Sequence, residues 1–339
     1  MMRLSSLFLV GLILCGLGGS KPGLAQDVPT AAQRAEVARQ YGLDPNSALE
    51  SRVQAASPTV LKMFEALKGP APTPHTLTEP EKRQLAEAFA VLTPLHQRVL
   101  RERLRSVNFL NGMPNTALTS IVNPMEPFPL FDITIRAAIL HQNVSEWLTE
   151  KERTCFDASA SPLSISIEAG TRDALAYVLL HEATHVLDAS LGITPPFSPG
   201  EPSPSSPPPT AFTRDVWSER TTPAPPYRDP LREHIRFYFG KPLPIDQAEA
   251  VYASLRRTPF VSLYGSTSWG DDLAEYVAVY HWTSHLKQPY RIILRKDGKQ
   301  IFAYEPMKSN LVRGRIDQMK PFYTKDRQDR AASSPSPLF

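Results

Sequence analysis

The stretch 179-LLHEATHVLD-188 carries two histidines four residues apart, His181 and His185, with a glutamate directly after the first. On an α-helix, residues i and i+4 lie on the same face, so the two imidazoles can converge on one metal ion. Glu182 lies next to them, where it could hold a metal-bound water and accept its proton. The pattern predicts a zinc site, provided that the chain supplies a third ligand and leaves one position open.

The residues around the motif predict a buried helix. Gly170 to Asp173 opens it, with Thr171 as a cap, and Gly192 ends it after about Leu191. Its apolar positions indicate burial: Leu175, Val178, Leu179, Val186 and Leu187. Two histidines and a glutamate inside such a helix would be costly without partners. This favours a metal site over the alternative of two satisfied core histidines and a surface acid.

The third ligand is expected in 264-YGSTSWGDDLAEYV-277, which puts three acids at the front of a helix running to about residue 286. Asp271 and Glu275 are four residues apart and share a face. One of them can bind the metal while the other accepts a hydrogen bond from the far nitrogen of a ligand histidine. Asp272 is about 100° around the helix, so it is expected to face water at the helix start.

Three other groups near these motifs are expected to lie outside the ligand set. His281 and His285 repeat the four-residue spacing, but His285 is about 21 Å along the helix from Asp271. We therefore expect surface or packing roles for this pair. Asp188, three residues after His185, is expected either to brace the site or to cap its helix.

Together, these motifs resemble those of the gluzincin metallopeptidases, and most closely the anthrax lethal factor type of catalytic domain. That group pairs His-Glu-x-x-His-x-x-Asp with a later Tyr-Gly-x-Thr stretch, seven residues from that tyrosine to the third ligand. Here the first element is His181–Asp188, the second is Tyr264–Thr267, and seven residues beyond Tyr264 is Asp271. The resemblance covers roughly residues 130–290.

The resemblance implies a role for each matched residue. Asp271 would be the third zinc ligand, Glu275 the acid behind a ligand histidine, and Tyr264 the hydroxyl donor to the reaction intermediate. Glu182 and the two histidines keep the roles given above, and the cofactor would be Zn²⁺. The ligand position is usually glutamate, and aspartate is one methylene shorter. This departure leaves open whether Asp271 or Glu275 reaches the metal.

The fold class expected from these patterns is α+β. Residues 131–325 would form a zincin-like domain, with the active-site helix beside a small mixed sheet, and residues 26–130 a mainly helical region before it. An edge strand is expected near residues 163–167. The other predicted elements are strands at 132–139, 290–294 and 299–304, and helices at 31–41, 79–90, 94–105, 230–239 and 246–256.

Two segments lack the composition of a packed core. Residues 194–230 hold many of the 34 prolines and are expected to be a long surface insertion, with Trp217 as a possible anchor. The tail 326–339 is expected to be disordered.

Residues 1–25 are typical of a secretory leader. Arg3 precedes an apolar run, and cleavage after Ala25 would put small residues at the required positions. We therefore expect an exported protein, periplasmic or secreted; a lipoprotein anchored through Cys15 is the weaker alternative. The apolar run is too short for a stable membrane span.

Composition narrows the function classes. The formal net charge is +3 and no Lys/Arg block stands out, which argues against nucleic acid. We expect a zinc-dependent metallopeptidase that acts on a peptide or protein substrate. The alternatives are an exported non-catalytic zinc-binding or structural protein on the same fold, and an amide hydrolase acting on cell-wall material. The oligomeric state stays open.

Overall fold

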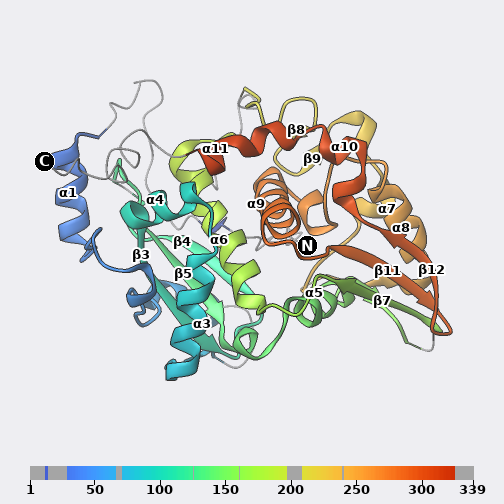
Figure 1. Cartoon of the computed structure of the whole chain (residues 1–339), viewed down its shortest axis with the longest axis horizontal. Coiled ribbons are helices and arrows are strands. Elements are labelled where there is room, and N and C mark those ends of the chain that lie inside the picture. Colours follow the sequence, from blue (N-terminus) through green and yellow to red (C-terminus); the bar gives the residue numbers. More distant parts are fainter. Residues whose placement is uncertain are drawn as a thin grey trace, which may run out of the picture.

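The computed structural model describes residues 12–13, 29–65, 71–124, 126–159, 161–196, 208–238 and 240–324 (Figure 1). Most of the expected leader, residues 197–207 of the proline-rich insertion and the tail 326–339 lie outside the described residues. Helices and several small sheets share the structure, which confirms the α+β class. None of the described helices combines the length and the apolar character that a membrane span needs.

The largest sheet has the strand order β1-β4-β5-β3-β2. β3 and β5 are parallel, whereas β4 runs antiparallel to β5, so the sheet is mixed. The strands are β1 (Leu12–Ile13), β2 (Thr73–Pro74), β3 (Leu104–Asn111), β4 (Ala117–Ile121) and β5 (Phe131–Arg136).

The expected domain boundary between residues 130 and 131 runs through this sheet, because β3 and β4 precede it and β5 follows it. The region before the boundary begins with helices, as expected, but continues into strands. β3 was missed because it is buried on both faces and lacks a polar/apolar alternation. The helices are α1 (Ala31–Gln40), α2 (Pro58–Glu65), α3 (Glu79–Ala90) and α4 (Pro94–Arg103).

A second, three-stranded sheet has the order β12-β11-β7, with β7 (Leu163–Glu168), β11 (Arg291–Lys296) and β12 (Lys299–Tyr304). The strands predicted at 290–294 and 299–304 are confirmed as the hairpin β11–β12, and Asp297 and Gly298 turn it with positive φ angles of 49° and 75°. β7 is an edge strand, but it packs on α5 (Val144–Arg153). The edge strand expected near residues 163–167 is thus confirmed, but its sheet is antiparallel, and the strand that packs on the motif helix is β4 of the mixed sheet.

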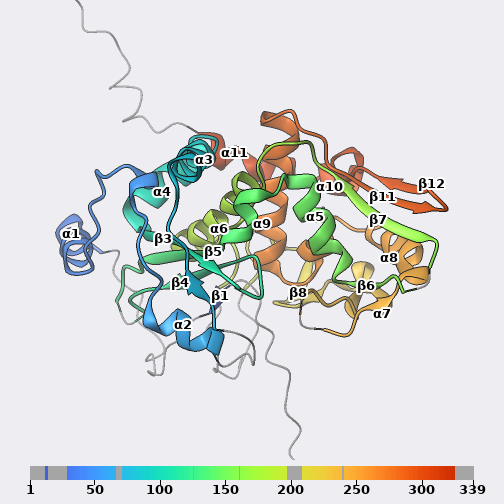
Figure 2. The same ribbon diagram turned by 90° about the horizontal axis from the view of Figure 1, so that it is seen from below.

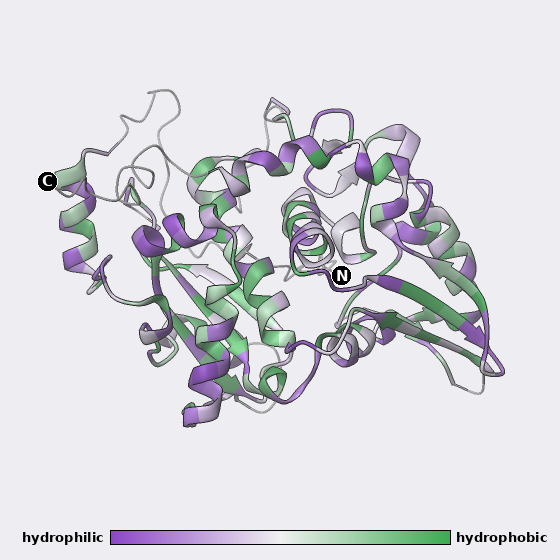
Figure 3. Cartoon of the chain, in the orientation of Figure 1, coloured by the Kyte–Doolittle hydropathy of each residue, from purple (hydrophilic) through white to green (hydrophobic). Residues whose placement is uncertain are grey.

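The motif at residues 181–185, HEATH in one-letter code, lies on helix α6 (Ala174–Leu191). This helix lies between the mixed sheet and α9 (Trp269–Tyr280) in both views (Figures 1 and 2). Asp173, rather than Thr171, is its N-cap residue, and Gly192 ends it in the left-handed region at φ 63°. α3 and α4 also pack on α6. Figure 3 shows mainly hydrophobic residues on α6, as its central place requires.

Residues 208–230 of the proline-rich insertion are packed against the protein. Trp217 is 5% exposed, and its indole Nε1 donates a hydrogen bond to Asp272 Oδ2 at 2.9 Å. Arg315 donates to both oxygens of the same carboxylate, at 3.0 and 2.7 Å. Two expectations were therefore wrong: residues 208–230 are not a loop without packing, and Asp272 does not face water. Trp217 is the anchor that its size suggested.

The remaining elements complete the part of the fold around α9. Two short strand pairs, β6 with β10 and β8 with β9, tie neighbouring loops together. Their bounds, with those of the remaining helices, are β6 (Phe156–Asp157), β8 (Trp217–Glu219), β9 (Thr222–Pro223), β10 (Leu243–Pro244), α7 (Pro230–Glu233), α8 (Ala248–Leu255), α10 (Asn310–Arg313) and α11 (Lys320–Tyr323).

Candidate metal centre

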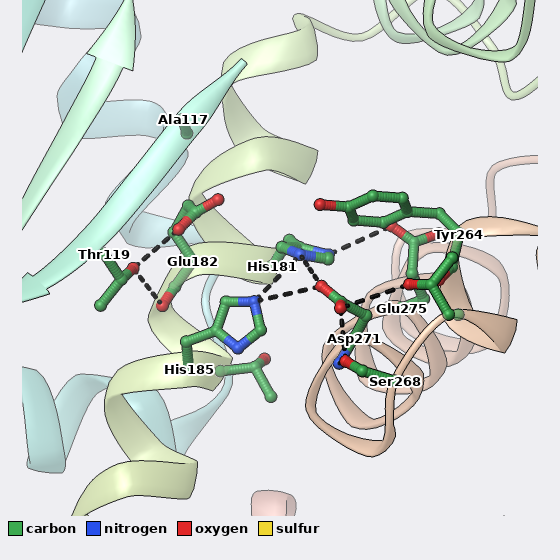
Figure 4. A network of polar contacts seen from close by, with 12 residues as sticks. Ala117, Thr119, His181, Glu182, His185, Tyr264, Ser268, Asp271 and Glu275 are labelled. Atoms are coloured by element: carbon green, nitrogen blue, oxygen red, sulfur yellow. Dashed lines mark hydrogen bonds and ion pairs between the residues drawn. The ribbon is translucent and has the colours of Figure 1, made fainter. Parts of the chain in front are cut away.

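α6 brings the two histidines of the HEATH motif together inside the protein. His181 and His185 are each 6% exposed, and their rings meet edge to face at 80°. Their Nε2 atoms are 3.2 Å apart (Figure 4). Burial, followed by the neighbouring His181, lowers the pKa of His185 well below its usual value, so its ring is neutral at physiological pH. Neutral imidazole is the form that binds metals.

Asp271 reaches the same point from α9. Ser268, the N-cap of α9, accepts a hydrogen bond from the Asp271 backbone and donates one to Asp271 Oδ2 at 2.5 Å. The other oxygen, Oδ1, lies 3.9 Å from His181 Nε2 and 3.8 Å from His185 Nε2. It is buried without a hydrogen-bond partner among the described residues. Such a group is costly unless something else satisfies it.

These three residues fit a metal ion. Their ligand atoms all lie within 4.8 Å of one another. Two ligands placed 2.0–2.1 Å from a tetrahedral zinc would be about 3.3 Å apart, close to the observed separation of the two Nε2 atoms. Asp271, rather than Glu275, has the carboxylate that faces both of these nitrogens.

Glu275 lies one turn further along α9 and faces the opposite nitrogen of His181. Its Oε1 is 3.1 Å from His181 Nδ1. Ser262 and Tyr177 donate hydrogen bonds to Oε2 at 2.8 and 3.2 Å, and Lys151 donates one to Oε1 at 3.4 Å. Burial alone would raise the pKa of Glu275, but the Lys151 charge and these contacts lower it to about 2. The carboxylate of Glu275 is therefore ionised at neutral pH and lies against the far nitrogen of His181.

Glu182 is beside the ligand group and is held from the sheet. Its Oε2 accepts a hydrogen bond of 2.7 Å from Thr119 Oγ1 on β4 (Figure 4). Burial raises the pKa of Glu182, although His181 and the Thr119 hydrogen bond oppose the shift. Glu182 therefore lies next to the His181–His185–Asp271 group without belonging to it.

Tyr264 faces this group across a small open-sided cavity, which His181, Glu182 and Tyr264 line together. Its ring centroid is 5.7 Å from that of His181, and its hydroxyl end is the end nearer Glu182 (Figure 4). Burial, with Asp271 and other nearby acidic groups, raises the pKa of Tyr264 well above its usual value. The phenol therefore stays protonated and can donate a hydrogen bond.

Asp188 is not brought to the ligand group. Its Oδ1 accepts a hydrogen bond from the Thr194 backbone at 2.7 Å, and its Oδ2 accepts one from the Thr194 hydroxyl at 2.6 Å. Of the two roles expected for Asp188, bracing the site or capping its helix, the structure supports the second.

Four residues of the site were missed in the sequence. Thr119, Lys151 and Tyr177 come from β4, α5 and α6, far from the motifs or on another face of the helix. No local pattern marks them. Ser262 lies two residues before Tyr264, so a closer inspection of that stretch could have found it.

Comparisons with protein-family models, with curated proteins and with solved structures found nothing that matches this chain. The candidate site therefore stands on its geometry, a buried His181–His185–Asp271 group that could hold a metal ion.

Proposed function

We propose that this protein is a zinc-dependent metallopeptidase with a gluzincin-like site. One observation carries the proposal: Oδ1 of Asp271 has no hydrogen-bond partner in the described part of the chain, and it faces the Nε2 atoms of both HEATH histidines. Two imidazoles and one carboxylate suit zinc, and three protein ligands leave a position open for chemistry. A structural zinc site usually has four protein ligands, so the alternative of a purely structural ion is less well supported.

Zinc, when bound, would supply a Lewis acid that lowers the pKa of a water molecule and polarises a carbonyl oxygen. The residues of the chain would do the rest. Glu182 would accept the proton of the attacking water and deliver it to the leaving amine. Tyr264 would donate a hydrogen bond to the oxyanion that develops on the substrate. Glu275 would hold His181 in its binding orientation.

β4 offers a way to align an extended peptide with the site. Thr119 on this strand holds Glu182, so a peptide paired with the outer edge of β4 would pass the ligand group. In the structure, Leu12 and Ile13 pair with this edge, opposite Thr119 and Ser120. Both residues belong to the expected leader, and its removal would free the edge. We propose that the substrates are peptides or proteins outside the cytoplasm.

Glu182→Gln tests the proposal. The purified protein without its leader is expected to hold about one zinc per chain and to cleave members of a broad peptide library, as followed by mass spectrometry. The variant is expected to keep its zinc and to lose about 10²- to 10⁴-fold in rate, because the amide cannot accept the proton. Zinc binding without any cleavage would favour the non-catalytic alternative. Cleavage of cell-wall amides but not of peptides would favour the other hydrolase.

A further inference from the structure

Lys151 is a buried cation in the cavity that leads to the candidate metal centre. It comes from α5, is 6% exposed, and lines the cavity together with Glu182, His181 and Tyr264. Its Nζ lies 3.5 Å from the centroid of the Tyr264 ring. Burial alone would lower the pKa of Lys151, but Glu275 and other neighbours raise it, so the ammonium group stays charged.

The Lys151 ammonium group has more hydrogen-bond donors than its partner Glu275 uses. Its one hydrogen bond among the described residues is the 3.4 Å contact with Glu275 Oε1. That is the longest of the Glu275 contacts, since Ser262, His181 and Tyr177 approach the carboxylate to between 2.8 and 3.2 Å. An ammonium group has three donors, and a buried cation gains from further acceptors. The cavity is the open side from which an acceptor can come.

The cavity is suited to a negatively charged group. Apart from Glu182, its lining residues are not acidic: Asn115, Thr116, Ala117, Trp147, Lys151, Val178, His181, Tyr238 and Tyr264. A second cavity shares Lys151 and Tyr238 and adds Arg136. The Arg136 guanidinium is 3.6 Å from Glu150, and its Nε has no hydrogen-bond partner among the described residues. Lys151 and Arg136 therefore place two cations in these adjoining cavities, and Glu150 is the one acidic residue that lines the second.

We propose that Lys151 determines specificity by binding a carboxylate of the substrate close to the bond that is cleaved. The inference rests on the proposed peptidase function and names its substrate class. The carboxylate can belong to an aspartate or glutamate side chain or to a free C-terminus. A charge-assisted hydrogen bond stabilises by about 1.5–3 kcal/mol, which corresponds to a preference of about 10- to 100-fold over the matching amide.

The test compares matched peptides built around a sequence that the wild-type enzyme cleaves. One pair carries glutamate or glutamine at each position flanking the cleaved bond, and a second pair ends in a free carboxylate or an amide. The wild type is expected to prefer the acid at one position about 10- to 100-fold in kcat/KM, and the pair that shows it identifies the source of the carboxylate. Lys151→Met is expected to bring this ratio close to one, and Lys151→Arg to retain part of it.

Zinc content and a matched control separate this role from support of the metal centre. Lys308→Met removes an exposed lysine that pairs with Glu305 and should leave the ratio unchanged. If Lys151→Met slows acidic and neutral peptides equally, the residue only positions Glu275, and the inference is overturned. No acid preference in the wild type also overturns it, while the peptidase function stands.

A binding measurement decides the case in which the wild type cleaves nothing. The proposed function would then fail, and zinc-loaded Glu182→Gln would be titrated with the same peptide pairs, using the fluorescence of Trp147, whose ring lies 5.4 Å from Lys151 Nζ. Tighter binding of the acidic peptide, lost in the double variant with Lys151→Met, would support the inference. Equal affinity for both peptides would overturn it.

Discussion

The chain contains the same spacing of two histidines twice, as HEATH at 181–185 and as HWTSH at 281–285. In the HEATH pair the two Nε2 atoms converge and an unpartnered carboxylate oxygen faces them. In the HWTSH pair the rings stack at 11°, with centroids 5.4 Å apart. His281 Nε2 contacts the Val91 carbonyl at 2.7 Å and its Nδ1 contacts the Tyr323 hydroxyl at 2.9 Å. This confirms a packing role for His281.

The comparison of the two pairs shows which features distinguish a candidate metal site from two packed histidines. Spacing on a helix brings two imidazoles near each other in both places, so spacing alone does not distinguish them. In the HWTSH pair, other protein groups already use the nitrogens of His281. In the HEATH pair, Glu275 faces one nitrogen of His181 and leaves the other directed at Asp271. A site needs nitrogens without protein partners and an acid aimed at the same point.

The largest contrast is expected when one histidine of each pair is removed. His181→Ala should lose its zinc, because only two ligands remain. His281→Ala should keep its zinc and lose about 1–3 kcal/mol of stability, since the Val91 carbonyl loses a buried partner. Zinc content by mass spectrometry and thermal unfolding measure both. Retention of full zinc binding by His181→Ala would break the comparison.

Asp271 and Asp272 give the next contrast, because adjacent acids have different partners. Asp271→Ala should abolish tight zinc binding. Asp272→Ala leaves Arg315 buried without its carboxylate and should cost about 3–5 kcal/mol of stability, while the folded protein still binds zinc. Calorimetric zinc titration and urea unfolding separate the two effects. The opposite pattern, with Asp271→Ala nearly silent and Glu275→Ala without zinc, would move the ligand one turn along α9.

Tyrosines beside the two pairs allow a matched test of the reaction. Tyr264→Phe should lower turnover about 100- to 1000-fold with little change in zinc affinity, because its hydroxyl acts on the developing oxyanion. Tyr323→Phe removes the hydroxyl next to His281 and should leave turnover within about twofold. Steady-state kinetics on a cleaved peptide measures both. Equal rates for wild type and Tyr264→Phe would remove this tyrosine from the mechanism.

The smallest expected effect concerns the support of the HEATH pair. Glu275→Gln keeps the size of the side chain but removes the charge that faces His181 Nδ1. Zinc affinity should fall about 10- to 100-fold, the usual cost of losing the group behind a ligand histidine. Competition with a chromophoric chelator measures the affinity. An unchanged affinity would mean that the contact does not orient the ring.

The sequence was sufficient where local patterns determine structure. The Gly192 stop, the helix at 79–90 and the strands at 290–294 and 299–304 follow from local signals, and the structure has all of them. The HEATH motif is also local, since one helix carries both histidines. The third ligand, Asp271, was predicted from a resemblance to the motifs of a family and not from a local pattern.

The parts that the sequence did not predict depend on distant contacts. Asp272 is buried because Trp217 and Arg315 reach it from segments far along the chain. β4 lies beside α6 through the pairing of strands, and no pattern in Ala117–Ile121 indicates that neighbour. Lys151 belongs to a helix with an ordinary amphipathic pattern, and only the packing of α5 brings it to the cavity.

The most direct test of the metal centre is a crystal of the mature protein measured at the zinc absorption edge, without added zinc or an affinity tag. The proposal predicts one anomalous peak, about 2.0–2.2 Å from His181 Nε2, His185 Nε2 and an oxygen of Asp271. A peak at the His281–His285 pair instead, or a folded protein that shows no peak even after soaking in zinc, would contradict it.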